Sequence, residues 1–220
     1  MKVPEKSKPD HYFSNKPTSK YQEFKISAIL RNRMFEFYTA PGVFSSKKVD
    51  LGTSVLIKQS KIPDEGIILD MGCGYGPVGI VFGVLNPIIQ VHFMDINQRS
   101  LDLAKKNAQL NKITNYRTFT GDCKQILKKN QIKYQAIYYN PPIKMGQENY
   151  LNDIITASEY LEDNGMFYIV IKKSLGAQGA FDKLAREFEK DTEKPTYEMD
   201  IIAKNSGYWI ITIKKTTDSN

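Results

Sequence analysis

The amino-acid sequence predicts an α/β protein built on a doubly wound, mostly parallel seven-stranded sheet. From residue 67 onward, short apolar runs typical of buried strands alternate with segments of helical periodicity, which is the pattern of a parallel sheet covered by helices. Two late strands surround the turn Asn205-Ser206-Gly207, which predicts an antiparallel C-terminal edge. Two runs of alternating polar and apolar residues before position 40 predict an N-terminal β-hairpin extension.

The length and composition indicate one substantial domain. The chain has 220 residues, of which 41% are hydrophobic, and this is enough for a sizeable core. Residues 1–20 are polar and rich in Lys, Pro and Ser, so we expect a weakly ordered lead-in. The hairpin and a helix then occupy residues 21–60, and the main α/β domain occupies residues 61–220.

The charge and the rare residue types narrow the class of protein. Lysine and arginine number 31 against 24 acids, for a net charge of +7, which suits a polyanionic partner such as RNA but is equally explained by a solvated basic surface. Two cysteines and two histidines at scattered positions indicate neither a disulfide framework nor a metal site. Neither a run of about 18 apolar residues nor a signal peptide is evident, so we expect a cytoplasmic protein without a membrane segment.

The extension begins with the hairpin. The alternation predicts strands at Phe24–Leu30 and Met34–Tyr38, joined by a turn at residues 31–33. A helix follows that ends near residue 60, and either Asp50 or Ser46 is suited to be its N-cap.

The main domain reads as an ordered series of strands and helices. Its expected strands are 67–69, 88–95, 116–120, 136–139, 166–171, 197–203 and 208–213. Its expected helices are 78–85, a segment capped by Asn97 and closed by Asn111, 123–129, a segment through Leu161 that ends at Asn164-Gly165, and a segment around 181–188.

A glycine-rich turn follows the first strand of this domain. Gly72, Gly74 and Gly76 remove side chains where the backbone turns and approaches a ligand, and Pro77 suits the first position of a helix. From Gly74, the sequence G-Y-G-P-V-G matches the dinucleotide fingerprint; from Asp70, D-x-G-x-G-x-G resembles the first motif of class I S-adenosylmethionine (AdoMet) methyltransferases. The glycines alone leave both cofactors open.

A second motif, Asn140-Pro141-Pro142-Ile143, follows the fourth expected strand. The prolines lack N–H donors and leave carbonyl groups free to accept hydrogen bonds, and the Asn140 side chain offers both an acceptor and a donor. Together they can accept the protons of an exocyclic NH₂ group. N-P-P-x at this position resembles motif IV of amino-directed AdoMet methyltransferases, and this favours AdoMet over a nicotinamide cofactor.

Nearly the whole chain resembles the small-domain ribosomal RNA guanine-N2 methyltransferases, and in particular their single-domain bacterial members. The resemblance is carried by the two motifs above and by the segments Gly42-Val43-Phe44-Ser45, Val49-Asp50-x-Gly52, Tyr12-Phe13-Ser14 and Lys172-Lys173-x-x-Gly176-Ala177. It implies a class I methyltransferase Rossmann-like fold, AdoMet as cofactor, and guanine N2 of small-subunit (16S) ribosomal RNA as the methyl acceptor.

The resemblance also implies roles for individual residues. It places the methionine end of AdoMet near the glycine turn, the ribose at Asp95, and the adenine at Ile96 and Asp122. The implied cofactor site comprises Asp70, Met71, Gly72, Cys73, Gly74, Gly76, Asp95, Ile96, Asp122, Cys123 and Asn140; the catalytic loop comprises Asn140, Pro141, Pro142 and Ile143; and candidate substrate contacts are Phe44, Lys48, Lys144 and Lys172.

One position departs from the family pattern. Ile143 stands where many base-modifying relatives have a Phe or Tyr that stacks on the flipped base. Phe44 is a candidate replacement ring, and a core aromatic that anchors the extension is the other interpretation of this residue.

Other functions stay open at this point. N-P-P loops also resemble those of protein glutamine and adenine N6 methyltransferases, whose substrates present the same planar NH₂. A nicotinamide-linked oxidoreductase would need a hydride-transfer constellation, and a non-catalytic RNA-binding module would not need the Asn140 motif. Which nucleotide is modified, and whether the substrate is naked RNA or an assembled subunit, do not follow from the sequence. Nor do the oligomeric state and the role of Cys73.

Overall fold

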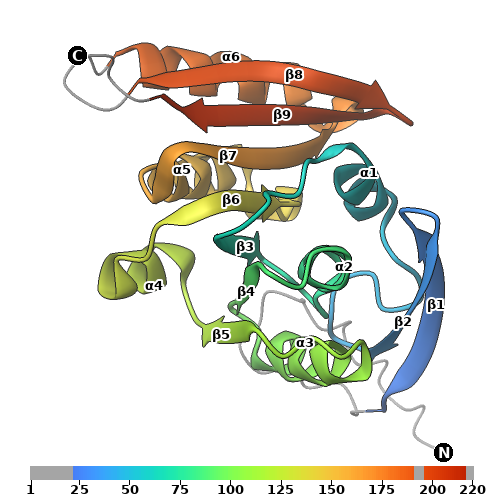
Figure 1. Cartoon of the computed structure of the whole chain (residues 1–220). Helices are drawn as coiled ribbons and strands as arrows, with labels where there is room; N and C mark the ends of the chain where they lie inside the picture. The colour runs from blue at the N-terminus through green and yellow to red at the C-terminus, as the bar shows by residue number, and fades with distance from the viewer. Residues whose placement is uncertain (1–21, 191–195, 217–220) are drawn as a thin grey trace, which may run out of the picture.

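The protein is built around a seven-stranded sheet. The computed structural model describes residues 22–190 and 196–216, and in it the strand order is β5-β4-β3-β6-β7-β9-β8. The five strands from β5 to β7 are parallel, and β9 and β8 form an antiparallel edge (Figure 1). The strands are β3 (Ile67–Met71), β4 (Gln90–Asp95), β5 (Tyr116–Thr120), β6 (Tyr134–Tyr139), β7 (Leu161–Lys172), β8 (Tyr197–Asn205) and β9 (Tyr208–Lys215). The expected fold class is confirmed.

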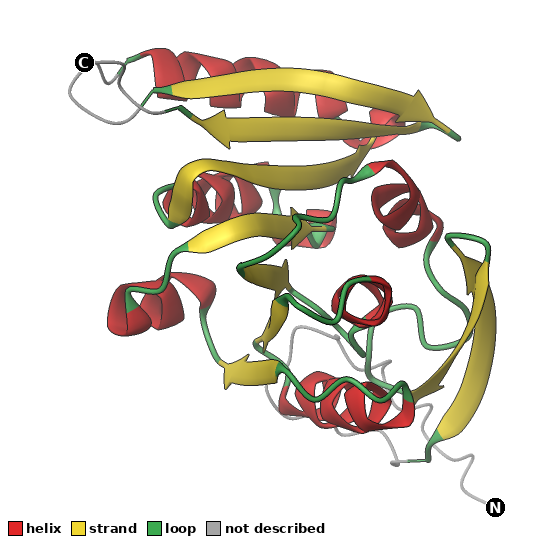
Figure 2. Cartoon of the chain, viewed as in Figure 1, coloured by secondary structure: helices red, strands yellow, loops and turns green. Residues whose placement is uncertain are grey.

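In the described ranges, the six α-helices cover both faces of the sheet (Figure 2). One core cluster lies between the sheet and α1 (Leu51–Gln59), α2 (Pro77–Leu85) and α3 (Gln98–Leu110). The other lies between the opposite face and α4 (Cys123–Asn130), α5 (Gln147–Ser158) and α6 (Ala177–Glu189). Short 3₁₀ turns, η1 (Ile143–Met145) and η2 (Lys173–Leu175), lie at the carboxyl ends of β6 and β7. Helices on both faces leave the carboxyl edge of the parallel strands as the place for a ligand.

The predicted hairpin is a separate two-stranded sheet made of β1 (Phe24–Leu30) and β2 (Arg33–Thr39). Its turn consists of Arg31 and Asn32, both with positive φ (51° and 59°), as a tight two-residue hairpin turn requires. Phe35 and Phe37 of β2 are buried in the core that contains α2 and α3.

Side chains of α3 hold the backbone of the extension in place. Asn107 accepts from the Tyr38 N–H at 2.6 Å and donates to the carbonyls of Tyr38 and Tyr75, each at 2.9 Å. Nearer the start of the helix, Arg99 donates to the Pro41 carbonyl at 2.6 Å. These bonds fix the chain that leads from β2 toward the ligand edge of the sheet.

One predicted helix boundary is wrong. α5 ends at Ser158, and Leu161 already pairs with Tyr134 as the first residue of β7. Asn164-Gly165, expected to cap the helix, lies in an irregular part of the strand, where Asn164 has φ 62° and a Cβ on Gly165 would come within 2.7 Å of the Glu162 carbonyl oxygen. An Asn-Gly pair supplies a tight backbone turn in either setting, so the local sequence did not distinguish a helix end from a kink in a strand.

Two further expectations concern the chain as a whole. The lead-in at residues 1–20, with Tyr12-Phe13-Ser14, lies outside the described residues. Within the described ranges, no helix is long and apolar enough to cross a membrane, and no cluster of His, Cys, Asp or Glu has the make-up of a metal site.

α2 lies close to β4 because a glycine faces the strand. A Cβ on Gly79 would come within 2.5 Å of Phe93 Cε1 and 2.7 Å of Val91 Cγ1, which is far inside van der Waals contact. Since both neighbours belong to the core, a side chain at position 79 has no room unless the helix moves.

We therefore expect Gly79→Ala to lower the free energy of unfolding by about 1–3 kcal/mol through overpacking, measured by urea and thermal unfolding. Gly179→Ala on α6 is the matched control. The nearest atom to its new Cβ would be Gln147 Nε2 at 3.8 Å, so helix propensity should raise stability by about 0.5–1 kcal/mol. An unchanged midpoint for Gly79→Ala would contradict this description of the α2–β4 contact.

Candidate active site

The glycine turn between β3 and α2 forms one wall of a cleft. Gly72, Gly74 and Gly76 have φ of 63°, 57° and 87°, which favours glycine at each position. Pro77 begins α2, as expected. A Cβ on Gly74 would meet no atom within 4 Å and would project into the open cleft. The missing side chain at position 74 therefore leaves room for a ligand against the backbone.

Asp70, in β3, is hydrogen-bonded to the helix that follows the glycine turn. Its side chain is buried (3% exposed), and its Oδ2 accepts from the Gly79 N–H in the first turn of α2 at 2.8 Å. Burial raises the pKa of this carboxyl well above its usual range, against the opposing effect of the Gly79 hydrogen bond. Asp70 lies with Cys73 in a smaller hollow beside the main cleft, so in this structure it orders the loop.

Asp95 joins the glycine turn to the end of β4. Its Oδ2 accepts from the Gly74 N–H and its Oδ1 from the Asn97 N–H, both at 2.8 Å. Burial raises the pKa of Asp95 to about 6, while these hydrogen bonds act in the opposite direction. Each carboxylate oxygen retains a further lone pair, and the residue lines the cleft, so it is placed to accept from hydroxyl groups of a ligand.

The cleft lies at the carboxyl ends of β3, β4, β5 and β6. It holds about 830 Å³ of empty space, its open mouth included. The structure brings together in its lining eleven of the residues expected from the sequence, namely Phe44, Met71, Gly72, Gly74, Asp95, Ile96, Asp122, Cys123, Asn140, Pro141 and Pro142.

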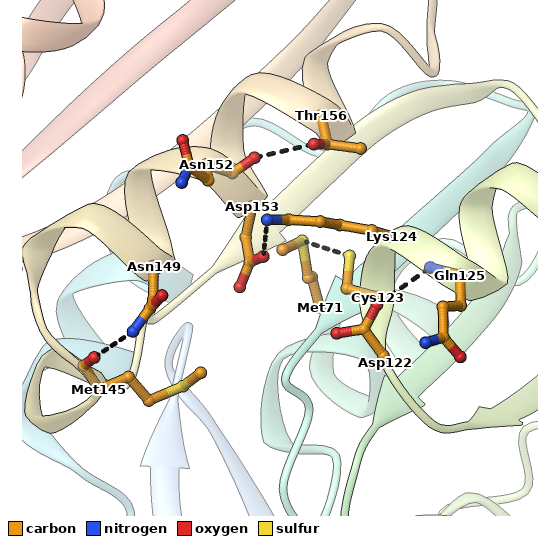
Figure 3. A network of polar contacts seen from close by, with 10 residues as sticks. All are labelled: Met71, Asp122, Cys123, Lys124, Gln125, Met145, Asn149, Asn152, Asp153 and Thr156. Carbon is orange, nitrogen blue, oxygen red and sulfur yellow. Dashed lines mark hydrogen bonds and ion pairs between the residues drawn. The ribbon is translucent and has the colours of Figure 1, made fainter.

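A network of polar contacts links α4, α5 and the end of β3 beside the cleft (Figure 3). Asp122 is the N-cap of α4, with its Oδ1 accepting from the Gln125 N–H at 3.0 Å. Asp153 of α5 faces Lys124 of α4 in an ion pair of 3.6 Å, and burial raises the pKa of Asp153. Cys123 Sγ lies 3.7 Å from Met71 Sδ. The ion pair and the thiol contact join α4, α5 and β3 around one end of the cleft.

The Asn140 side chain is hydrogen-bonded to residues at the start of α1. Its Nδ2 donates to Asp50 Oδ2 at 3.0 Å and to Thr53 Oγ1 at 2.9 Å. A carboxylate only accepts, so the amide nitrogen must face Asp50 and the Asn140 carbonyl oxygen is turned away from it. Since Asn140 lines the cleft, the arrangement offers the cleft an acceptor whose orientation is fixed.

Some expected site residues lie outside the main cleft. Gly76 faces the core, where a Cβ would meet Phe93 and Ala104. Ile143 is partly buried against the core on the α4–α6 side. The side chains of three candidate substrate contacts are exposed and do not line the cleft; they are Lys48, Lys144 and Lys172. Phe44, by contrast, is 38% exposed at the edge of the cleft, which corrects the alternative of a core aromatic.

Sequence reasoning missed several residues of the site. Asp50 was expected as an N-cap, which it is, but not as a partner of Asn140. Asp153 gave no signal, because a single acid in an amphipathic helix ordinarily faces solvent. Other cleft residues without a motif of their own are Met94, Ser100, Gly121, Tyr139 and Met145. Of these, Met94, Gly121 and Tyr139 adjoin expected residues, and proximity in sequence was the available signal.

Comparison with known proteins identifies the family. Residues 34–212 match the family model described as the methyltransferase small domain. The uncharacterized protein YbxB of Bacillus subtilis (strain 168) is 36% identical over 207 residues, which cover 94% of this chain and 98% of that protein. The ribosomal RNA small subunit methyltransferase C of Pseudoalteromonas atlantica is 27% identical over 177 residues, which cover 75% of this chain and 48% of that enzyme. The chain thus spans about half the length of that relative.

The solved structures agree on the fold. A 16S rRNA N2 methyltransferase of T. thermophilus (RsmC), in complex with AdoMet and guanosine, superposes with a TM-score of 0.71 at 19% identity, over 91% of this chain and 52% of that one. This likeness confirms the expected Rossmann-like methyltransferase fold. Because the family model covers most of the sequence and a relative is 36% identical along nearly its whole length, this chain belongs to the methyltransferase small domain family.

Proposed function

We propose that this protein binds AdoMet in the main cleft and transfers its methyl group to the exocyclic N2 of a guanine in small-subunit ribosomal RNA. The observation that carries the proposal is the fixed orientation of the Asn140 amide at the edge of the cleft. A carbonyl acceptor held there suits a substrate nitrogen that brings protons, as an exocyclic amine does. Family membership supports the reaction type.

The residues of the cleft fit AdoMet. Gly74 leaves open space for a ligand against the backbone, and Asp95 offers carboxylate oxygens suited to both ribose hydroxyls. Ile96 is 37% exposed at the cleft and gives an apolar surface for the adenine. Asp122 is an acceptor suited to the adenine amino group. The set combines a hydroxyl acceptor, an apolar face and an amino acceptor, which are the groups an adenosine needs.

The chemistry proposed for Asn140 is positioning of the acceptor. When bound, AdoMet supplies an electrophilic methyl group, so the N–CH₃ bond forms as the C–S bond breaks and its electron pair goes to sulfur. The lone pair of the guanine N2 is delocalised into the ring and is therefore a poor nucleophile. Hydrogen bonds from the amine to the Asn140 carbonyl oxygen, and to the Pro141 carbonyl, favour the tetrahedral form that attacks. Alignment of this kind accounts for a large share of catalysis in transfer reactions.

RNA is proposed as the substrate on charge and on the relatives. The chain carries a net charge of +7, and Lys48, Lys144 and Lys172 are exposed at the carboxyl end of the sheet, where they can contact phosphates. A guanine within a helix would have to be flipped or already unpaired to enter. Two of the similar proteins described above are ribosomal RNA methyltransferases. Protein glutamine and adenine N6 present the same planar NH₂ and are the alternatives the assay must separate.

Asn140→Ala should abolish most methyl transfer while leaving AdoMet binding intact, because the change removes the oriented acceptor and none of the groups assigned to the nucleoside. The assay is incorporation of labelled methyl into ribosomal subunits and naked rRNA from a strain lacking the protein, followed by nucleoside mass spectrometry for N2-methylguanosine. Asn152→Ala, at an exposed position of α5, is the matched control. Label that survives RNase treatment, or full activity of Asn140→Ala, would refute the proposal.

Affinity for AdoMet should fall as the pH drops through about 6. The ionised Asp95 accepts from two hydroxyls, and its pKa is raised to about 6 by burial. Protonation at lower pH turns one of its oxygens into a donor, so one of the two hydroxyls loses its acceptor. Calorimetry should give a Kd about tenfold weaker at pH 5 than at pH 7. Asp95→Asn should bind weakly with a flat profile between these values, and Asp102→Ala, an exposed acid on α3, should behave as wild type. A slope retained in Asp95→Asn would assign the titration to another group.

Phe44 is proposed to stack on the target base in place of the aromatic residue that Ile143 replaces. Base–aromatic stacking contributes about 1–3 kcal/mol, so Phe44→Ala should raise the KM for RNA by about 5- to 100-fold without changing AdoMet affinity. Phe44→Tyr keeps an aromatic ring and should have a KM for RNA close to that of the wild type. Ile88→Ala, a 71% exposed apolar residue before β4, serves as the control. Equal KM values for Phe44→Ala and wild type would exclude stacking by this ring.

A further inference from the structure

We propose that Asp50 is a positioning residue that acts through Asn140. It fixes the orientation of the Asn140 amide, so that the carbonyl oxygen faces the substrate amine, and it places a negative charge on the far side of that amide. This inference rests on the proposed function of the same site. Asp50 precedes Asn140 by 90 residues and belongs to the extension, yet its Oδ2 lies 3.0 Å from Asn140 Nδ2.

The position of Asp50 is itself fixed by the helix it caps. The same Oδ2 accepts from the Thr53 N–H at 3.0 Å, and this bond holds the carboxylate. The Ser54 hydroxyl donates to the Asp50 backbone carbonyl at 3.0 Å and does not contact the carboxylate. Gly52 allows the close packing around it, because a Cβ there would come within 2.9 Å of both Asp50 Oδ2 and the Tyr208 ring. The Asp50 carboxylate is therefore held by the first turn of α1 independently of Asn140.

An asparagine side chain needs such an orienter at this position. The amide is nearly symmetric in shape, and a half-turn about its last bond would exchange the carbonyl oxygen for the NH₂ group. The flipped form would direct Asn140 Oδ1 at the Asp50 carboxylate and present N–H donors to an incoming amine, which also donates. Both contacts oppose the flip, since they set acceptor against acceptor and donor against donor. Pro141 and Pro142 add no N–H groups that could reverse this preference.

The charge of Asp50 has a second consequence. Among the described residues, no lysine or arginine forms an ion pair with Asp50, so its charge is balanced through hydrogen bonds, one of them from Asn140. The transfer forms an N–CH₃ bond at a neutral amine, so positive charge develops on that nitrogen until it releases a proton to solvent. The Asp50 carboxylate, which is hydrogen-bonded to the Asn140 side chain that contacts the amine, stabilises that positive charge.

Two variants of Asp50 separate its hydrogen bond to Asn140 from its role as the N-cap of α1. Asp50→Ser keeps a hydroxyl that can cap the helix, but its side chain is too short for the contact to Asn140. Asp50→Asn keeps the length of the aspartate side chain and removes its charge. We expect Asp50→Ser to lower kcat about 10- to 100-fold with AdoMet affinity unchanged, and Asp50→Asn to recover part of the loss. Ser54→Ala, in the same turn but without a contact to Asn140, should retain wild-type kcat. A loss as large in Ser54→Ala would indicate a defect of the helix and would overturn the inference.

A double-mutant cycle shows whether Asp50 acts through Asn140. In the Asn140→Ala background, Asp50→Ser should produce little further loss of kcat, because the group it positions is already absent. Full additivity of the two losses would overturn the inference, since it would place Asp50 on a separate route.

Nuclear magnetic resonance of the protein without RNA or AdoMet gives a readout independent of activity. The side-chain amide signals of Asn140, assigned by their absence in Asn140→Ala, should shift and exchange faster with solvent in Asp50→Ser and remain in place in Ser54→Ala. Unchanged signals in Asp50→Ser would overturn the inference even if the enzyme methylates RNA. Shifted signals together with an absence of RNA methylation would uphold the orientation by Asp50 and refute only the proposed substrate.

Discussion

The hydrogen bond from the Gly79 amide to the buried Asp70 carboxylate is the contact on which the site geometry depends. Asp70 ends the central strand β3 and is 3% exposed, and a buried acid is costly unless it is hydrogen-bonded. Its partner lies in the first turn of α2 at 2.8 Å, where free N–H groups and the helix dipole favour an acceptor. The bond joins the two ends of the glycine turn, so the turn cannot open without leaving Asp70 unpaired.

α3 extends this constraint to the other parts of the cleft. The Asn97 N–H donates to Asp95 at 2.8 Å, and the Asn97 side chain donates to the Gly42 carbonyl at 3.0 Å. Asn107 makes a similar connection between β2 and the Tyr75 carbonyl in the glycine turn. One helix therefore sets the position of the acid assigned to the ribose and of the loop that carries Phe44. The extension is docked by hydrogen bonds from side chains of α3 and its N-cap to the backbone, which fix position more narrowly than apolar packing alone.

The fold class and the gathering of polar residues at the strand ends were predictable because each depends on a local pattern combined with one topological rule. Residues that end parallel strands meet at one edge of the sheet, so Asp70, Asp95, Asp122 and Asn140 could be assigned to a common region before any contact was known. The Asn164-Gly165 boundary failed because one dipeptide serves two backbone turns. Asp153 reaches the cleft through the packing of α5 on α4, and no periodicity in the sequence reports such a contact.

The acceptor side of the site depends on contacts that no sequence pattern announces. Phe44, Asp50 and Thr53 all come from the extension, and they meet Asn140 or the edge of the cleft only after the chain has folded. The loop after β6 carries Ile143, which is partly buried against the core. Strand ends form most of the cleft, and a short segment ahead of the sheet completes it. Under the proposed function, residues 42–53 therefore act on the methyl acceptor together with Asn140 and Pro141.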